Sequence, residues 1–231
     1  MNNLFSIFSP QSGLGGFPLN WIIGAGAVVA MPGGFWVSSG SVGTSMSGLA
    51  GYLHGEFVAV LGASRAPGTG YLLVNLALYI LTINLMGLLP YVFTNSAHMV
   101  FALALTLPIW LGHYIYSWIS QPGSMLAHLV PGGTPGVLIP FMVLIESVSS
   151  LIRPLTLSVR LMANMTAGHL LLSLVSGSMA ASGWGVSGAV IWGLLALLGL
   201  EMAVAVIQSY VFVTLMTLYV GEVQSKAIKI I

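Results

Sequence analysis

The sequence predicts an all-α polytopic membrane protein with about five to six helices, because of its composition and the length of its apolar runs. Of the 231 residues, 57% are hydrophobic and only 4% are charged, with a mean hydropathy of +1.01. A soluble domain carries about 25% charged residues, so this chain cannot cover itself with a water-exposed surface. A β-barrel would need short alternating segments, whereas the apolar runs here are long and uniform. We expect a single membrane domain over residues 1–231.

Charge and composition exclude several classes of protein. A net charge of +1 excludes electrostatic nucleic-acid binding as a main role. The absence of cysteine excludes disulfides, thiolate zinc sites and iron–sulfur clusters. The sequence has no P-loop and no nucleotide-binding domain, so we expect no catalytic residue for phosphoryl transfer. The N-terminus has neither a basic region nor an Arg-rich amphipathic pattern, so we expect no cleavable targeting segment.

The first third of the chain predicts one span and one shorter segment. Residues 18–37 form an apolar run that is broken or ended near Pro32, and we interpret it as the first span. A Gly- and Ser-rich stretch follows. Residues 52–62 are apolar apart from His54 and Glu56, but they are too few to cross a bilayer. We therefore expect this segment to be interfacial or re-entrant.

The middle of the chain predicts an antiparallel pair of spans. Residues 71–93 and 97–119 are each long and apolar enough to cross, and a short polar turn joins them. Residues 121–136 contain repeated Pro and Gly, which predicts a loop.

The last two apolar stretches, residues 137–176 and 184–220, are longer than a span requires. As helices each would be roughly 55–60 Å long, against a hydrocarbon core of about 30 Å. Either each contains a break, for which Pro154 is a candidate, or both are steeply inclined. We expect a long inclined hairpin, since inclination on this scale needs a specific partner to pack against.

The few basic residues near the ends of the spans predict the orientation. Arg65 precedes the antiparallel pair, and Lys226 and Lys229 follow the two long segments. Four crossings separate these sites, so they share one side, which the positive-inside rule makes the matrix or cytoplasm. The first span then places the N-terminus on the opposite side.

The first long stretch carries a polar stripe. Glu146, Arg153 and Arg160 are each seven residues apart, so they drift only about 20° per step along one helix face. Asn164 lies one turn beyond Arg160, and His169 lies roughly on the opposite face. A charge in hydrocarbon costs at least about 2.5 kcal/mol, so such residues usually face a partner, a cavity or an ion path.

The last stretch carries a second stripe, in which Gln208 follows Glu201 by seven residues and Glu222 lies a further fourteen along. In a hairpin, His169 and Glu201 would lie toward the turn, whereas Glu146 and Glu222 would lie toward the open ends. Glu and His exchange protons near neutral pH when burial or neighbours shift them, whereas Arg stays protonated. The pattern is typical of proton movement past a fixed cation.

These residues also resemble a known family. Residues 153–169 closely resemble the signature of subunit a of F-type ATP synthase, also called ATPase subunit 6, in its mitochondrial form. Residues 84–90, 105–110 and 128–135, followed by Glu201 with Gln208, fit the same family in the same order. The resemblance covers residues 71–222, and residues 1–70 match only in general character.

The resemblance implies a role for each polar residue of the two stripes. Arg160 matches the essential cation that faces the carboxylates of the rotating c-ring, and Asn164 and Gln208 match polar lining. Glu201 and His169 match the pair in the half-channel open to the intermembrane space. The matrix-side half-channel is expected to contain Glu146 and Glu222. The family's two long helices lie nearly along the membrane and curve round the ring, which accounts for their length.

The resemblance further implies partners and a location. It implies a stator subunit in the mitochondrial inner membrane, with the N-terminus on the intermembrane side and the C-terminus in the matrix. The expected partners are the c-ring, peripheral-stalk subunits and other membrane-sector subunits, with no nucleic acid. No cofactor or metal is expected; bound lipid such as cardiolipin and a dimer of complexes are compatible with the resemblance.

The residues by themselves leave alternatives open. Another polytopic ion transporter is one, although the chain has no internal repeat. A haem-binding respiratory membrane subunit is another; it would use His pairs on facing helices, whereas His98 and His113 share one segment. Arg153 could be the working cation in place of Arg160, or it could reach lipid headgroups. His169 could be structural, Gln208 a helix–helix hydrogen bond, and Glu222 a solvated end charge. We expect packing or interface roles for His54, His98, His113 and His128.

Overall fold

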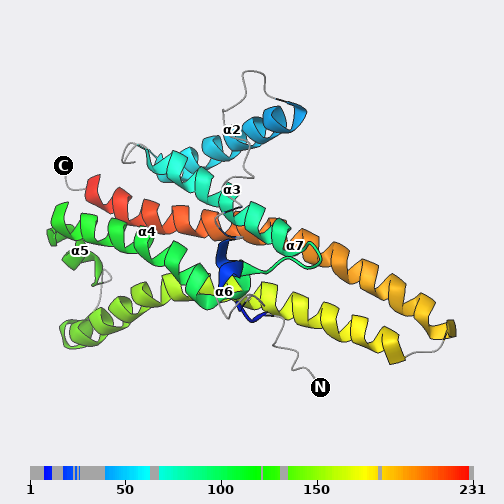
Figure 1. The fold of residues 1–231 in the computed structure, drawn as a ribbon. Helices are drawn as coiled ribbons and strands as arrows, with labels where there is room; N and C mark the ends of the chain where they lie inside the picture. Colours follow the sequence, from blue (N-terminus) through cyan, green and yellow to red (C-terminus); the bar gives the residue numbers. More distant parts are fainter. Residues whose placement is uncertain are drawn as a thin grey trace.

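The computed structural model describes residues 8–11, 18–22, 24, 26, 40–62, 68–120, 122–130, 135–181 and 184–228. These residues are helical apart from short turns, as the sequence predicts for its apolar runs (Figure 1). The loop predicted over residues 121–136 is wrong in part, because Pro122–His128 form a short helix. In lipid, a helix satisfies its backbone hydrogen bonds within the segment, so long apolar runs in a membrane form helices. In chain order the elements are η2 (Leu19–Trp21), α2 (Ser41–Leu61), α3 (Thr69–Gly87), η4 (Asn95–Ala97), α4 (Met99–Ser120), α5 (Pro122–His128), η5 (Gly136–Leu138), α6 (Ile139–Ala181) and α7 (Trp184–Ile228).

Four of the described helices are long and apolar enough to cross a membrane, namely Thr69–Gly87, Met99–Ser120, Ile139–Ser178 and Val190–Gly221. They correspond to the antiparallel pair and to the two long stretches of the sequence. Most of the predicted first span lies outside the described residues. The basic side chains of Arg65, Lys226 and Lys229, on which the predicted orientation rests, also lie outside them.

Helix α2 is longer than the segment that the sequence singled out. It begins at Ser41 and runs for 21 residues, so it includes much of the Gly- and Ser-rich stretch. Glycine and serine weaken an isolated helix, but this one packs against α3 and α7. Phe57 and Leu61 enter the core at 1% and 2% exposure. Tertiary contacts therefore hold the second half of this helix.

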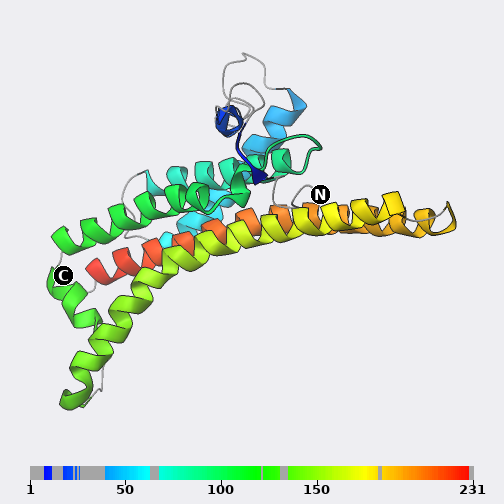
Figure 2. The ribbon, with the colours of Figure 1, turned by 60° about the horizontal axis from the view of Figure 1, so that its bottom comes forward.

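The hairpin of α6 and α7 is the longest feature of the molecule. Helix α6 has 43 residues and continues through Pro154, and α7 has 45 residues. Figure 2 shows that the first part of α6 bends away from α7, whereas the rest lies along it. A proline inside a helix removes one backbone hydrogen bond and commonly bends the helix. The hairpin therefore forms a curved pair of helices, with residues 182 and 183 of the connection outside the described residues.

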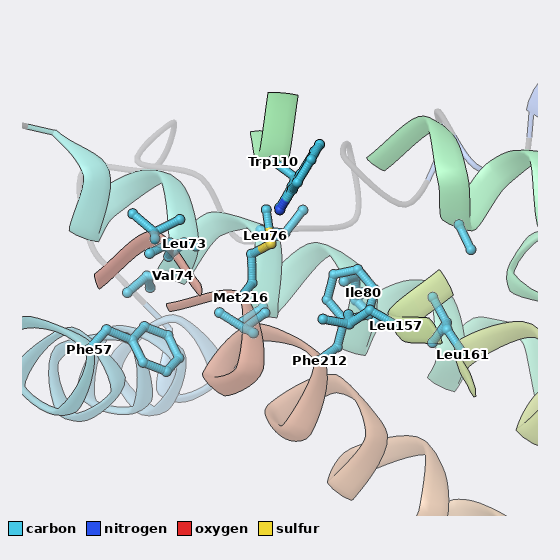
Figure 3. Close-up of a cluster of buried hydrophobic side chains, with 14 of the residues drawn as sticks. Phe57, Leu73, Val74, Leu76, Ile80, Trp110, Leu157, Leu161, Phe212 and Met216 are labelled. Carbon is cyan, nitrogen blue, oxygen red and sulfur yellow. The ribbon is translucent and has the colours of Figure 1, made fainter. Parts of the chain in front are cut away.

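The core surrounds the second half of α7, which contacts α2, α3, α4 and α6. Figure 3 shows Phe212 and Met216 of α7 among side chains from these four helices. Both side chains are 0% exposed. Leu73 and Ile80 of α3 and Leu161 of α6 are at most 1% exposed. This packing fixes α7 against α3 and α6 and thereby sets the position of the polar residues one to three turns earlier in α7.

Candidate proton-transfer site

A buried carboxyl group lies at the centre of the polar region. Glu201 of α7 is only 3% exposed. Its Oε1 lies 3.9 Å from Nε2 of His169 on α6. Among the described residues neither carboxyl oxygen has a hydrogen-bond partner. The hairpin therefore brings together the two titratable residues that the sequence placed near its turn.

Gly168 allows α6 and α7 to approach closely at this point. A Cβ built on Gly168 would lie 2.9 Å from Cδ and 3.2 Å from Cγ of Glu201. Contacts between carbon atoms are ordinarily above about 3.5 Å, so any side chain at this position would displace the glutamate. The glycine beside the histidine therefore makes room for the carboxyl group.

On the function that the family resemblance implies, we expect Gly168→Ala to reduce proton flux about tenfold or more while the protein still assembles, because a misplacement of about 1 Å in a reacting group can cost about 100-fold. The measurement is ATP-driven proton pumping by the assembled complex in vesicles. Gly177→Ala on the same helix is the matched control, since a Cβ there meets nothing within 4 Å. Equal pumping by both variants would contradict the close approach.

His169 has a second polar neighbour that sequence reasoning missed. The hydroxyl oxygen of Thr94 lies 3.3 Å from Nε2 of His169, within hydrogen-bond distance. Thr94 immediately precedes η4, in the turn between α3 and α4, and is 6% exposed. A residue 75 positions away in the sequence gives no periodic signal for such a contact. The ring of Phe8 covers the imidazole edge-on at 6.5 Å between ring centroids.

A second pair of polar residues joins the same two helices closer to Arg160. Asn164 Nδ2 donates a hydrogen bond to Gln208 Oε1 at 2.8 Å. Gln208 is 5% exposed, and its Nε2 has no partner among the described residues. Asn164 is half-buried. The pair therefore links the buried interior to the side of α6 on which Arg160 is exposed.

Asn84 of α3 completes the buried polar region, and sequence reasoning gave it no role. It is 0% exposed, and its Nδ2 donates to the backbone oxygen of Ala205 at 3.4 Å. Its Oδ1 has no partner in the described part of the chain. Asn84 opens one of the segments that fit the family, and that segment was the available signal for it.

The two arginines of the stripe differ in their surroundings. Arg160 is exposed, and no ion pair involves it in the described ranges. Arg153 is half-buried, and its guanidinium carbon lies 5.2 Å from the centroid of the Tyr219 ring, a cation–π contact with α7. Of the two cations, Arg160 is therefore the one presented outward from the hairpin.

Of the two predicted matrix-side residues, the structure describes the side chain of Glu146 alone. Glu146 is half-buried in the first part of α6, where that helix departs from α7 (Figure 2). Glu222 belongs to α7, but its side chain lies outside the described residues. Glu146 thus lies in a different part of the hairpin from the buried pair.

A second carboxylate, that of Glu56 on α2, contacts α7 at Tyr210, away from the Glu201 pair. The hydroxyl of Tyr210 donates a hydrogen bond to Oε2 of Glu56 at 3.0 Å. Glu56 also accepts a hydrogen bond from Tyr52, and this raises the pKa of the Tyr52 phenol above its ordinary value. Glu56 therefore ties α2 to α7 and has defined partners, unlike the carboxyl group of Glu201.

Neither metal nor haem coordination is supported by the described residues. They contain no group of three or more His, Cys, Asp and Glu side chains that could hold a metal ion. His113 Nδ1 lies 2.8 Å from the backbone oxygen of Ile109, one turn earlier in α4. His98 packs against the rings of Trp21 and Phe93. These two histidines are thus in packing contacts, and the side chain of His128 lies outside the described residues.

Comparison with known proteins independently supports the family resemblance that the sequence motifs show. A family model described as ATP synthase A chain matches residues 44–221. A protein of Drosophila melanogaster named ATP synthase subunit a is 44% identical over 223 residues, which are 96% of this chain and 99% of the relative. The proteins of the same name from Anopheles gambiae and Locusta migratoria are 44% and 41% identical, with the same coverage of both chains.

Proposed function

The chain belongs to the ATP synthase A chain family, and we propose that Glu201, His169 and Arg160 carry out proton transfer within it. The chain is a multi-pass, non-catalytic subunit of F-type ATP synthase and the proton-translocating stator of its membrane sector. This membership sets aside the alternatives of an unrelated ion transporter and a haem-binding subunit. The proposal assigns the residues that move the proton, the direction of its flow and the partners of the chain.

The uptake half-channel contains His169 and Glu201. The observation that carries this assignment is the burial of Glu201 at 3% exposure, with His169 3.9 Å away and no hydrogen-bond partner for either carboxyl oxygen among the described residues. An idle carboxyl group in this position would be costly. Carboxyl and imidazole groups both accept and release protons, so the pair can hold a proton in transit.

From the buried pair the proton moves toward the outward side of α6. Buried Gln208 of α7 and half-buried Asn164 of α6 are hydrogen-bonded to each other at 2.8 Å and link the interior to this side. Their amides supply donors and acceptors that orient water along the path. The proton then neutralises a carboxylate of the c-ring, which turns with that site facing lipid.

Arg160 separates the uptake path from the release path. A guanidinium stays protonated, so it cannot relay a proton itself. Its charge stabilises the ionised form of a ring carboxyl group that reaches it, and this favours release of the proton on the second side. The same charge opposes direct proton leakage between the two half-channels. The exposure of Arg160 fits a role toward a separate partner.

The release half-channel contains Glu146 and Glu222. Glu146 is half-buried in the part of α6 that departs from α7, far along the helix from the Glu201 pair. Each proton that crosses supplies about 2.3 kcal/mol per 100 mV of membrane potential, in addition to the contribution of the pH difference.

The chain works in the mitochondrial inner membrane, with its C-terminus in the matrix and its N-terminus on the intermembrane side. The insect relatives and the His169–Glu201 arrangement, which matches the mitochondrial form, support this location. Its partners are the c-ring, the peripheral stalk and other membrane-sector subunits, with lipid such as cardiolipin at its surface and a dimer of complexes as the larger assembly. Membership of ATP synthase implies contacts with other subunits of that complex.

A density map of the assembled complex tests this proposal directly. We expect a ring of helical hairpins beside α6, with the carboxyl groups of the ring passing Arg160. If that side chain instead contacts lipid or a helix of another stator subunit, and no ring carboxyl group passes it, the assignment of Arg160 is wrong.

A further inference from the structure

The turn between α3 and α4 contains an unusual set of buried polar atoms. Asn95 and Ser96 of η4 are each only 1% exposed. The Nδ2 and Oδ1 atoms of Asn95, the hydroxyl of Ser96 and Nε2 of His98 all lack a hydrogen-bond partner among the described residues. None of these three residues has a role in the proton path proposed above.

Small residues and rings enclose this turn. A Cβ on Gly24 would overlap Nδ2 of Asn95 and lie 3.5 Å from its Cγ. A Cβ on Gly87 would lie 2.8 Å from Cγ2 of Thr94. The imidazole of His98 has its centroid 5.2 Å from the rings of both Trp21 and Phe93. The polar atoms are therefore shielded from lipid by the protein itself.

Buried polar groups in proteins nearly always have a hydrogen-bond partner, either in the protein or in ordered water. An amide, a hydroxyl and an imidazole together offer both donors and acceptors, and an internal water molecule typically binds about three such groups. These four atoms belong to three residues within one turn. Their chemistry is therefore that of a site for water.

The turn also adjoins the proposed uptake pair. Thr94 places its hydroxyl 3.3 Å from Nε2 of His169. The backbone N–H of Ala97 donates to the oxygen of Thr94 at 3.3 Å, and that of His98 donates to the oxygen of Asn95 at 3.1 Å. These bonds hold Thr94 and the three unpartnered side chains in one compact unit.

We propose that this turn, which we define as residues 94–98, binds a water cluster that forms the inlet of the uptake half-channel. Water held by Asn95, Ser96 and His98 delivers protons to His169 beside Thr94. This inference rests on the proposed function of His169 and Glu201. It adds the location of the inlet and the residues that hold its water.

The absence of native cysteine makes a direct test available, because Ser96→Cys introduces the only thiol of the chain. The substitution is nearly isosteric. The probe is a small cationic methanethiosulfonate, added separately to each face of vesicles that contain the assembled complex. We expect modification from the intermembrane face, on which the proposed orientation places this turn. Modification should abolish most ATP-driven proton pumping. The complex without the Ser96→Cys substitution is the control, because it shows any effect of the reagent on thiols of other subunits.

Ser158→Cys is the matched control for burial. Ser158 is 0% exposed, but its hydroxyl donates to the backbone oxygens of Pro154 and Leu155 at 3.1 and 2.9 Å. We expect this cysteine to stay unmodified. Tyr91→Cys is the control for access, since Tyr91 precedes the turn and is fully exposed. A modified Tyr91→Cys together with an unreactive Ser96→Cys would overturn the inlet.

A second variant carries the test if Ser96→Cys lowers the yield of complex. His98→Phe keeps a ring against Trp21 and Phe93 but removes the nitrogen that would bind water. We expect slower proton pumping in a fully assembled complex, and unchanged pumping would count against the inlet. A failure of the inlet leaves the Arg160 and Glu201 variants inactive, whereas active forms of those variants would refute the proposed function itself.

Discussion

Arg160→Ala is expected to abolish coupled proton flux in the assembled complex. The variant removes the exposed cation of α6, which no ion pair engages among the described residues. Without a fixed positive charge, a ring carboxyl group has no electrostatic reason to release its proton before the release half-channel, and the two half-channels lose the barrier between them. The measurements are ATP synthesis under an imposed proton gradient and ATP-driven acidification of vesicles.

Arg153→Gln is the matched control for this experiment. Arg153 lies on the same stripe, seven residues earlier, but its guanidinium packs on Tyr219 at 5.2 Å. Loss of a cation–π contact of this kind is worth about 0.5–2 kcal/mol and would affect packing more than transport. We expect most of the flux to survive. Normal ATP synthesis by Arg160→Ala would refute the proposed mechanism, and loss of synthesis only in Arg153→Gln would assign the role to the other arginine.

Glu201→Gln is expected to slow proton transport by about 100-fold or more, since a positioned proton-transfer group commonly contributes about 10²–10⁴-fold. Glutamine keeps the shape of the buried side chain and still fits against Gly168, so assembly should survive. It cannot take up and release a proton in the same way. The measurement is the initial rate of proton pumping, normalised to the amount of assembled complex.

Glu56→Gln is the control for the glutamate variant. It makes the same change on α2, at a carboxylate whose partner is the Tyr210 hydroxyl at 3.0 Å and which lies outside the proposed path. Exposed hydrogen bonds of this kind contribute about 1 kcal/mol, so the expected effect is a small loss of stability with proton pumping retained. Equal pumping by both variants would show that the buried carboxyl group does not carry protons.

Local patterns in the sequence were sufficient for the fold class, whereas the choice of Arg160 over Arg153 came from the family resemblance and stays a prediction. Long apolar runs predict membrane helices wherever they occur, because lipid offers no partner to an unpaired backbone group. The spacing of seven residues predicts which polar side chains share a face, and the structure has one of these cations exposed and the other on Tyr219. The boundaries were less accurate: α3 ends at Gly87, whereas the predicted span ended at residue 93, and α6 continues to Ala181, whereas the predicted stretch ended at residue 176.

The members of the buried site needed the tertiary structure. The hairpin alone suggested that His169 and Glu201 lie near each other, but Thr94 and Asn84 come from other elements, 75 and 121 positions away in the sequence from their partners. Periodicity describes one helix at a time and carries no information about which faces of distant helices meet. The same limit applies to α2, whose second half packs into the core through Phe57 and Leu61.

The sequence by itself thus determined a helical membrane protein, its family and a short run of residues in which a permanent cation precedes a histidine. The fold alone decided that Gly168 brings a carboxyl group next to that histidine, and that the hydroxyl of Thr94 lies within hydrogen-bond distance of the imidazole. The physical reason is that burial and hydrogen-bond satisfaction are properties of the whole packed molecule. The burial of Glu201 at 3% exposure, for example, depends on α6, because Gly168 and His169 of that helix lie directly beside it.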